Sequence, residues 1–586
     1  MALSKHWWPA PNKGDFPSFP PDDLPAGGAR ELRNYLVHHD GRVVPRGSIG
    51  GSTALLSGSL AQPAGGVPVL VASYYGILSA QYRAGSAVPT VDAWRVPINK
   101  PAAAAQLTTP IVGADALGQA TLKDGVTSFS AQADIGRVTS YRAIPSLDAV
   151  YGMAQSGTAT AVPDGFAPLT RVNKRPISLT GVVLHNGPGF VQDIFYHYDR
   201  LFVLAARRPG STTEYDHGGL FWTIPGGTTG NSDLLSDWRE PVSGLVNTIK
   251  VGNPIAGDFG VGMGRAAGQL VIFMRKSVWV LYGTNPDDFT LRQLRPSHGC
   301  IDPRSIVTVP EGVIFASPAG LELFDGTKFT LLSRPVADQW LEFSNRGPGS
   351  NSVNHSYIRC TELPNRYLFI ALGTDPNVAF GTGGAERSWL YHLPTGAWIQ
   401  LAGSAPALAL GAAGAFTAAT VGENDVELWG GARWARCDRL TFGLQTGVGL
   451  RDIDPAGSYA VDLDWKTGLA DLGRVWNTAK LTHMTADYRQ TWVDDTGTID
   501  GQLGTVQLRD SAGDIGTPLA LPGSRPTGAP LRRRPVEDTH HELPRGDVEA
   551  RARCNTGGND AALRTGELAV YGLGLEYEPD GRNRRL

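Results

Sequence analysis

The chain has 586 residues, with 73 glycines and 41 prolines, and charged residues make up only 18% of it. Its length predicts two or three domains, and its wealth of turn-forming residues indicates an all-β class with few long helices. The formal net charge of −3 argues against bulk affinity for nucleic acid, while a hydrophobic content of 41% is enough for a packed core.

Residues 1–170 are the least regular part of the sequence. A strand or two with a turn at Asp40-Gly41 are predicted early, and Pro68–Ser73 and Val91–Ile98 could be further strands. From Ala102 to Gln132 the chain shows little periodicity, so we expect an extended arm that is ordered by a partner. The first domain is therefore predicted over 1–170, as an N-terminal arm and part of a platform.

Residues 171–450 carry a series of hairpin units, and the clearest pair lies between Gly268 and Ser333. Apolar runs rich in Val, Ile, Phe and Trp alternate with tight turns, which favours strands over helices. Asp325-Gly326 predicts a primed turn with positive φ at both central residues. The best helix candidate is Ser333–Phe343, with Ser333 near the N-cap and Pro335 in the first turn.

The spacing of these units indicates the architecture. Successive inner strands begin near Leu270, Val313, Tyr367 and Val426, at unequal intervals of 43, 54 and 59 residues. Such intervals are typical of propeller blades with loops of variable length, because a small twisted sheet must stack against neighbours to bury its faces. Two packed β-sandwiches remain the alternative.

Residues 451–586 have a different character. Long predicted strands, including Tyr459–Trp465, Ala479–Tyr488 and Gly504–Arg509, are separated by turns rich in Gly and Asp, and a late strand lies within Gly566–Pro579. The segment predicts a second β-rich platform domain, possibly completed by N-terminal strands. The fold class expected from the whole sequence is all-β: a β-propeller, a platform domain and an irregular N-terminal region.

Motifs for catalysis or cofactor binding are weak. Gly260–Gly268 superficially resembles a dinucleotide loop, but a strand follows it where that motif needs a helix, so we interpret it as a turn with close backbone approach. His38-His39 and His540-His541 are adjacent pairs that a strand would point to opposite faces, so neither is a ready chelator. No cofactor, metal site or catalytic residue is predicted.

Carboxylates and thiols suggest little more. Asp462 and Asp464 would share one face of a strand and could seat a cation or act as a glycosidase-like pair, but we interpret them as solvated surface charge. The cysteines are widely separated in sequence and include no C-x-x-C pair, which indicates buried free thiols. They are Cys300, Cys360, Cys437 and Cys554.

Two basic clusters could touch phosphate groups; the alternative is a solubilising loop and a frayed tail. The possible DNA-contacting residues are Arg532, Arg533, Arg534, Arg582, Arg584 and Arg585.

Targeting and membrane segments are not predicted. The first twenty residues lack the apolar centre of a signal peptide, and no run reaches the ~18 apolar residues of a membrane span. We therefore expect a soluble protein that is made in a cytoplasm.

The central hairpins resemble a known protein family. The segments VIFMRKSVWVLYG (271–283) and GCIDPRSIVTVPEGVIFASPAGLELFDGTKFTLLSRPVADQW (299–340) are similar to the tail nozzle, or tail tubular protein B type, of short-tailed bacteriophages. This family is related to packaged-DNA stabilising tail hub proteins. NYLVHHDGRVVPRGSIGG (34–51) and LGLEYEPDGRNRR (573–585) add to the resemblance, which is specific over about 250–345.

The resemblance implies a structural protein of the virion tail and no enzyme. It implies a ring, expected to be a homohexamer, below the portal and adaptor, near tail fibres or spikes. Such a ring, assembled in the host bacterial cytoplasm, would continue the DNA channel, retain packaged DNA and open for ejection, with transient, non-specific contact with viral DNA. The alternative functions are a glycan-binding or glycan-cleaving propeller acting as a receptor-binding tail protein, and a bacterial propeller scaffold unrelated to phage.

Overall fold

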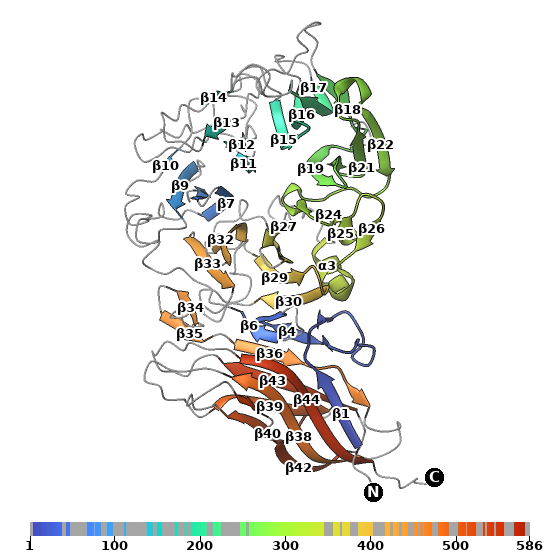
Figure 1. Ribbon diagram of the computed structural model, residues 1–586, viewed down its shortest axis with the longest axis vertical. Coiled ribbons are helices and arrows are strands. Elements are labelled where there is room, and N and C mark those ends of the chain that lie inside the picture. The colour runs from blue at the N-terminus through green and yellow to red at the C-terminus, as the bar shows by residue number, and fades with distance from the viewer. Residues whose placement is uncertain are drawn as a thin grey trace.

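The computed structural model consists mainly of strands, which confirms the predicted all-β class (Figure 1). The residues that it describes are 4–37, 43–46, 67–74, 77–83, 91–97, 111–112, 138–144, 149–154, 170–173, 182–183, 189–207, 215–223, 247–253, 257–344, 356–363, 366–374, 385–401, 416–421, 426–432, 436–442, 451–454, 457–460, 462–471, 479–490, 502–510, 513–522, 531–533, 536–543, 547–555 and 568–579.

Seven antiparallel sheets follow one another along the described chain between residues 67 and 442. The first five are separate four-stranded sheets, the sixth consists of four strands between residues 356 and 401 that belong to a larger twelve-stranded sheet, and the seventh has three strands. The first three sheets comprise β7 (Val67–Tyr74), β8 (Ile77–Arg83), β9 (Val91–Pro97) and β10 (Ile111–Val112); β11 (Val138–Ile144), β12 (Ala149–Ala154), β13 (Thr170–Asn173) and β14 (Val182–Val183); and β15 (Gly189–His197), β16 (Arg200–Arg207), β17 (Tyr215–Trp222) and β18 (Thr248–Lys250).

The remaining four sheets complete the series. They comprise β19 (Gly260–Ala266), β20 (Gln269–Met274), β21 (Val278–Tyr282) and β22 (Thr290–Arg295); β23 (Val307–Val309), β24 (Gly312–Ser317), β25 (Gly320–Phe324) and β26 (Phe329–Leu331); β27 (Ser356–Leu363), β28 (Tyr367–Thr374), β29 (Ala385–His392) and β30 (Ala397–Leu401); and β31 (Phe416–Val421), β32 (Val426–Ala432) and β33 (Arg436–Phe442).

The seven sheets close into a ring, which identifies them as propeller blades. The first strand of each sheet lies beside the first strand of the next, and β31 of the last sheet lies beside β7 of the first. Figure 1 looks onto this ring, with the blades arranged around a centre. The apolar cores lie between blades, because Met263 and Leu270 pack with Phe202 of the blade before them, and Val271 packs with Phe315 of the blade after them.

The first two blades change the expected organisation of the N-terminal region. Strands β7–β10 and β11–β14 form four-stranded sheets of the ring, and the predicted boundary at residue 170 falls inside the second sheet, at the start of β13. Strands were predicted at Pro68–Ser73 and Val91–Ile98, which overlap β7 and β9, but their place in blades was not, because short strands joined by long connections leave weak periodicity in the sequence. The stretch 113–137 lies outside the described residues.

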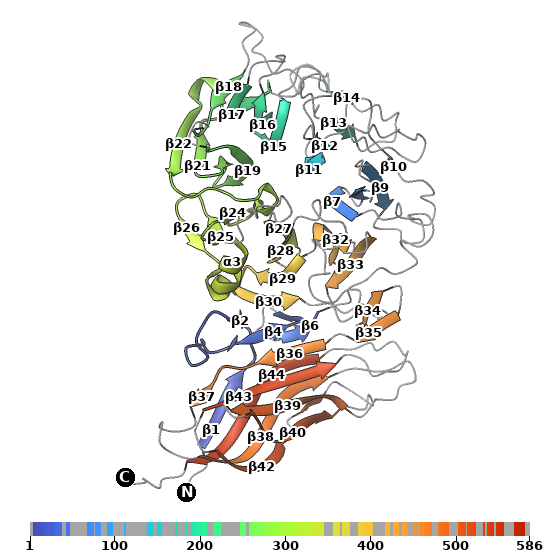
Figure 2. The same ribbon diagram turned by 180° about the vertical axis from the view of Figure 1, so that it is seen from behind.

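A platform of two large sheets lies beside the propeller (Figure 2). Its C-terminal strands are β36 (Asp462–Lys466), β37 (Ala470–Asp471), β38 (Ala479–Gln490), β39 (Gln502–Asp510), β40 (Gly513–Pro522), β41 (Leu531–Arg533), β42 (Val536–Leu543), β43 (Asp547–Asn555) and β44 (Leu568–Pro579). Its N-terminal strands are β1 (Ser4–Pro9), β2 (Gly14–Asp15), β3 (Gly28–Ala29), β4 (Glu31–Arg33), β5 (Tyr35–Val37) and β6 (Val43–Pro45). A separate hairpin is formed by β34 (Arg451–Asp454) and β35 (Gly457–Ala460).

Strands from the two ends of the sequence pair within both platform sheets. In one sheet, β1 and β6 pair with β44; in the other, β4 pairs with β36. The propeller is therefore inserted between the two parts of the platform sequence, and β1 begins and β44 ends at the end of the platform far from the propeller (Figure 1).

The only α-helix that the described residues include is short. It is α3 (Ala337–Ser344), preceded by a 3-10 turn at Arg334–Val336, which agrees with the predicted helix over 333–343. Further 3-10 turns lie at Pro286–Asp288 and Pro303–Ser305. Trp340 of α3 is buried against the fifth and sixth blades. No helix within the described ranges is long and apolar enough to span a membrane.

The turn at Asp325-Gly326 differs from its prediction. Phe324 pairs with Phe329, so the loop contains four residues, and only Gly326 has positive φ. The Asp325 carboxylate accepts hydrogen bonds from the backbone N–H groups of Thr327 and Lys328 at 2.8 and 2.9 Å. This side-chain turn replaces the expected primed turn, because an aspartate can satisfy two amides without adopting a left-handed conformation.

Candidate functional site

The six arginines predicted to contact DNA are not brought together by the described structure. Arg532 and Arg533 lie on β41, opposite Arg489 and Tyr488 of β38. Arg534 and the three C-terminal arginines, Arg582, Arg584 and Arg585, lie outside the described residues. Their contact with DNA therefore stays a prediction.

The glycines at 260–268 are used for blade packing rather than in a ligand loop. Gly260, Gly262 and Gly264 lie on β19, and the hairpin turn is made by Ala267 and Gly268, both with positive φ. A Cβ atom at Gly264 would lie 2.5 Å from Val313 Cγ2 of the next blade. The interpretation of the whole segment as a turn was wrong, although its backbone does approach its neighbours closely, as expected.

Carboxylates hold adjacent blades together. Asp193 Oδ2 of the third blade accepts a hydrogen bond of 2.7 Å from Met263 N of the fourth. Asp302 Oδ2, just before the fifth blade, accepts one of 3.1 Å from Ile358 N of the sixth. Both aspartates are buried. Buried carboxylates stabilise a fold when backbone amides satisfy them, so these side chains have a structural use.

The buried thiols are also inert. Cys300 and Cys360 are buried and form no disulfide. Burial raises the pKa of Cys300 to about 12 and raises that of Cys360 well above its ordinary value. A protonated, buried thiol is a poor nucleophile and a poor metal ligand. Cys437 and Cys554 lie on β33 and β43, and their side chains are outside the described set.

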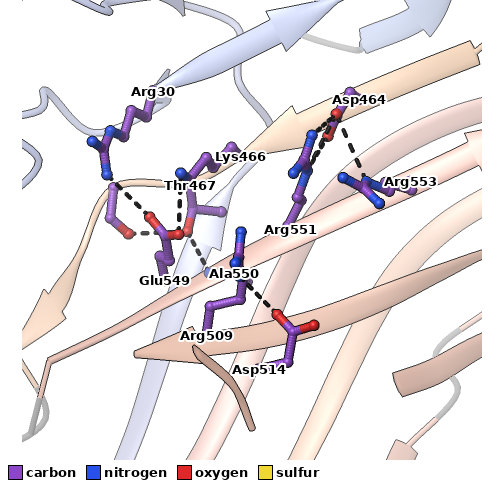
Figure 3. Close-up of polar contacts among 11 residues, drawn as sticks. Arg30, Asp464, Lys466, Thr467, Arg509, Asp514, Glu549, Ala550, Arg551 and Arg553 are labelled. Atoms are coloured by element: carbon purple, nitrogen blue, oxygen red, sulfur yellow. Dashed lines mark hydrogen bonds and ion pairs between the residues drawn. The ribbon is translucent and has the colours of Figure 1, made fainter. Parts of the chain in front are cut away.

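Charged side chains cover one face of the platform sheet that contains β4, β36, β43, β39 and β40 (Figure 3). Register places Arg33, Asp464, Arg553 and Thr505 in one row across four strands. Glu31, Lys466, Arg551 and Gln507 form the adjacent row. We call this surface the arginine face and define it by Arg30, Arg33, Lys466, Arg509, Arg551 and Arg553.

Alternation explains why this face is polar. The intervening residues of the same strands, which point to the opposite face, are apolar and buried. They are Leu32, Leu463, Trp465, Val506, Leu508, Val548, Ala550 and Ala552. The two faces of this sheet are therefore a buried core and a charged exterior.

Asp464 is held by two arginines. Arg551 donates to both carboxylate oxygens, with Nε 2.9 Å from Oδ1, and Arg553 Nε lies 3.9 Å from Oδ2. The hydrogen bond to Asp464 raises the pKa of the Arg551 guanidinium. The interpretation of Asp464 as solvated surface charge was wrong, because a paired arginine covers it. Asp462 lies on β36 opposite Asn555, and its side chain is outside the described set.

A second buried carboxylate repeats this arrangement. Glu549 lies 3.4 Å from Arg30 Nη1 and 3.2 Å from Lys466 Nζ. The side chains of Asp464 and Glu549 are 9% and 10% exposed, whereas those of Arg553 and Arg30 are 62% and 42% exposed. At these two sites the carboxylates lie beneath the cations that neutralise them. At the third pair the order is reversed, because Asp514, which lies 2.7 Å from Arg509 Nε, is 64% exposed and Arg509 is 36% exposed.

The sixth blade joins the platform through paired strands. Strand β30 of the sixth blade pairs in parallel with β4 at Gln400 and Arg33, and with β2 at Trp398 and Gly14. One sheet therefore runs from the blade into the platform, and we call this joint the seam. A Cβ atom at Gly14, where φ is +88°, would lie 2.4 Å from Trp398 N, so this approach requires glycine.

Asp15, next to Gly14, is a buried carboxyl group in the seam. Burial, and then the negative charge of Glu31, raise its pKa well above the ordinary value, although Arg33 opposes them. Backbone N–H groups of Phe16 and Leu32 hydrogen-bond the carboxyl group, but Oδ1 has no partner within the described structure. Neither Asp15 nor the arginine face was identified from the sequence; only strand register reveals which charges become neighbours.

Arrangements suited to metal binding were sought in the same residues. No group of three or more His, Cys, Asp or Glu in the described part of the chain is placed to hold a metal ion. His540 and His541 lie next to each other on β42, and His38-His39 lies outside the described residues.

Comparisons with known proteins add little. No protein-family model matches the chain, and no curated protein matches it. Among solved structures, a mutant Trypanosoma rangeli sialidase has a TM-score of 0.28 at 8% identity, covering 78% of this chain and 93% of its own. A puromycin-hydrolyzing peptidase from Mycobacterium tuberculosis has a TM-score of 0.33 at 10% identity, covering 72% and 61%.

A propeller domain is among the similar structures. The β-propeller domain of the trilobed protease from Pyrococcus furiosus has a TM-score of 0.30 at 7% identity, and the match covers 64% of this chain and 95% of that one. Similarity at this level does not inform function. The propeller fold of this protein therefore rests on its strand pairing and the closed order of its blades.

Proposed function

We propose that this protein is a structural subunit of a bacteriophage tail, which forms the nozzle or hub ring that continues the DNA channel. The ring, a homohexamer, would assemble in the host bacterial cytoplasm, adjoin the portal and adaptor, and lie near the tail fibres or spikes. It would retain packaged DNA and open for ejection. The sequence resemblance over about 250–345 suggests this family. The structure adds an argument from the rigidity of the joint between propeller and platform.

The observation that carries the proposal is the seam. In the sheet β27–β28–β29–β30–β4–β36–β43–β39–β40, backbone hydrogen bonds connect a propeller blade to the platform. Tyr367 of the blade donates a hydrogen bond to the carbonyl oxygen of Val37, and Asn34 N donates to Gln400 O at 2.9 Å. A joint through a shared sheet resists bending better than a flexible linker, as the wall of a conduit requires.

The proposal assigns no catalytic role. Four of the five aspartates that are buried within the described residues are held by the fold. Asp193, Asp258 and Asp302 accept backbone hydrogen bonds, and Asp464 is paired with arginines. The fifth, Asp15, lies in the seam and has one oxygen without a partner. A glycosidase needs two carboxyl groups that face a substrate. The carboxylates named here are held by the fold itself, which favours a structural function over glycan cleavage.

Contact with DNA in such a conduit should be weak. Each neutralised phosphate adds salt-dependent affinity, so a surface that grips DNA would slow its passage. A net charge of −3 suits passage. Neutralising Arg532–Arg534 together with Arg582, Arg584 and Arg585 should lower the residual affinity for DNA at 50 mM salt and leave assembly intact. Tight binding of one DNA sequence at physiological salt would contradict the conduit.

The assembly state tests the function directly. Purified protein should form a closed ring, seen by light scattering after gel filtration and by negative-stain imaging, and antibodies against it should label virion tails. A monomer that binds an oligosaccharide would instead support the receptor-binding alternative. A monomer with neither property and no place in virions would contradict both tail functions.

A further inference from the structure

One flat face of the propeller carries exposed apolar side chains. Strands β19 and β21 run in one direction and β20 and β22 in the other, so the start of β19, the β20–β21 turn and the end of β22 lie at the same face of the ring. Three side chains on this face, in the fourth and fifth blades, are 43%, 40% and 44% exposed: Phe259, Ile301 and Leu331. They are the only exposed large hydrophobic side chains among the propeller residues that the structure describes.

Hydrogen bonds bring the first two of these residues together. In the β20–β21 turn, Arg275 N donates to Phe259 O at 2.8 Å. The residue before it, Met274, accepts a hydrogen bond of 2.9 Å from Cys300 N. Ile301 follows Cys300 directly, so Phe259 and Ile301 lie on either side of the end of β20.

The fifth blade extends this surface. Ile301 N donates a hydrogen bond of 3.0 Å to Ala316 O, near the end of β24. Leu331 lies beside the turn that follows β24, since its Cδ1 atom would be 2.7 Å from a Cβ atom added at Gly320. The three side chains therefore lie along one continuous stretch of two blades. We call it the Phe259 face and define it by Phe259, Arg275, Ile301 and Leu331.

The charged groups around Phe259 are cations at the surface and carboxylates in the interior. Lys250, at the end of β18, is exposed, and so are Arg275 and Lys276 in the β20–β21 turn. Asp258 is buried and accepts a hydrogen bond of 2.7 Å from a backbone N–H, and Glu322 is buried in an ion pair. At the opposite face of the same blades, exposed carboxylates lie beside cations; they are Asp199, Asp287, Asp288 and Glu311.

This combination favours a protein partner over a lipid surface or a nucleic acid. More than half of each apolar side chain is covered by the propeller, so none of the three can reach the ~5–10 Å into a bilayer that interfacial anchoring requires. Phosphate groups gain nothing from three apolar side chains at the centre of a contact. Protein interfaces, in contrast, combine an apolar centre with charged groups at the rim.

We propose that the Phe259 face binds a segment of another protein in which apolar side chains are flanked by carboxylates. The apolar side chains would cover Phe259 and Ile301 and remove them from water. The carboxylates would pair with Arg275, whose guanidinium can accept such a partner in a bidentate arrangement, and with Lys250. This partner is additional to the proposed ring, and its binding does not depend on that ring.

The test measures binding of a fluorescein-labelled peptide that repeats Glu-Phe-Asp-Gly three times. Fluorescence anisotropy should show saturable binding to the full chain at low salt. Phe259→Ala and Ile301→Ala should each weaken this binding at least about fivefold. Arg275→Gln should weaken it and also reduce its dependence on salt, because one charge pair is lost. Peptides with Lys in place of both acids, or with Ala in place of Phe, should bind at least about fivefold more weakly than the first.

Matched variants elsewhere provide the controls. Trp7→Ala removes a platform side chain that is also 44% exposed, and Arg292→Gln removes an exposed arginine on β22, away from the β20–β21 turn; both should leave peptide binding unchanged. Near-ultraviolet circular dichroism checks the fold, and Arg275→Gln keeps the test valid if an apolar variant fails to fold.

Several outcomes would overturn the proposed partner. They are the absence of saturable binding to the acidic peptide, equal binding of the lysine peptide, and an equal loss in the control variants. Binding of phosphatidylcholine–phosphatidylserine vesicles that requires Phe259 would assign the face to lipid instead, and competition by a DNA duplex would assign it to nucleic acid. Each of these results would leave the ring function standing, because imaging of the assembly and labelling of virions test that function separately.

Discussion

Substitution of Gly264 with alanine tests how tightly the blades pack. The added Cβ atom would lie 2.5 Å from Val313 Cγ2, whereas ordinary contact begins at 3.4 Å, so the two blades must separate locally by 0.9 Å (3.4 minus 2.5). Overpacking of this kind costs about 1–3 kcal/mol. Replacing a strand glycine returns about 0.5–1 kcal/mol of backbone entropy. Subtracting the return from the cost leaves an expected net loss of about 0–2.5 kcal/mol, with a central value of about 1 kcal/mol.

A double-mutant cycle separates steric conflict from other effects. Val313→Ala alone should destabilise the fourth and fifth blades by about 2 kcal/mol, because it leaves a cavity between them. In the double variant, the missing Val313 methyl groups give the new Cβ atom room. The combined loss should therefore be smaller than the sum of the single losses by about 1 kcal/mol or more.

Hydrogen exchange of peptides covering 260–295 is the suitable assay, because a multidomain chain need not unfold in one step. Amide protection in the fourth blade should fall about tenfold for each 1.4 kcal/mol lost, while platform peptides stay unchanged. Simple additivity in the cycle, or equal loss of protection across the platform, would refute the argument that Gly264 is required by contact with Val313.

Three other changes address the seam and the thiols. Tyr367→Phe leaves the Val37 carbonyl oxygen without its donor, so we expect the seam to lose about 1–3 kcal/mol, seen as faster exchange at β5 and β28 but not at β20. Asp15 has a pKa raised in the folded state, so the folded chain binds more protons than the unfolded one, and stability should fall as pH rises from about 4 through the folded-state pKa. Asp15→Asn should flatten this slope; an unchanged pH profile would show that Asp15 does not cause it. Cys300 should resist thiol reagents at pH 8 in the folded protein and react after denaturation, as mass spectrometry of its peptide would report; rapid labelling of folded protein would contradict its burial.

Local sequence patterns predicted where the central hairpins lie along the chain, but not which residues of other strands they would contact. The runs Leu270–Met274 and Val278–Tyr282 became β20 and β21 because β-branched and aromatic residues were bounded by turn residues. The predicted strands Pro68–Ser73 and Val91–Ile98 became β7 and β9, but their place in a propeller blade was not predicted, because the strands of the first two blades carry weaker periodicity. No local pattern indicates that Arg551 would lie beside Asp464, since 87 residues separate them in sequence. Such pairs depend on the register between strands that are distant in sequence, and the residues next to each partner do not reveal that register.

Insertion of the propeller within the platform has a consequence for synthesis on the ribosome. Strand β6 ends at Pro45, and its partner β44 begins at Leu568, so the early strands wait for 523 further residues (568 minus 45). At ~5–20 residues per second, this delay lasts on the order of half a minute to two minutes. Throughout it, Trp7 and Trp8 have no sheet to join. The nascent N-terminus is therefore a natural client for a chaperone, and shortening the propeller would shorten its exposure.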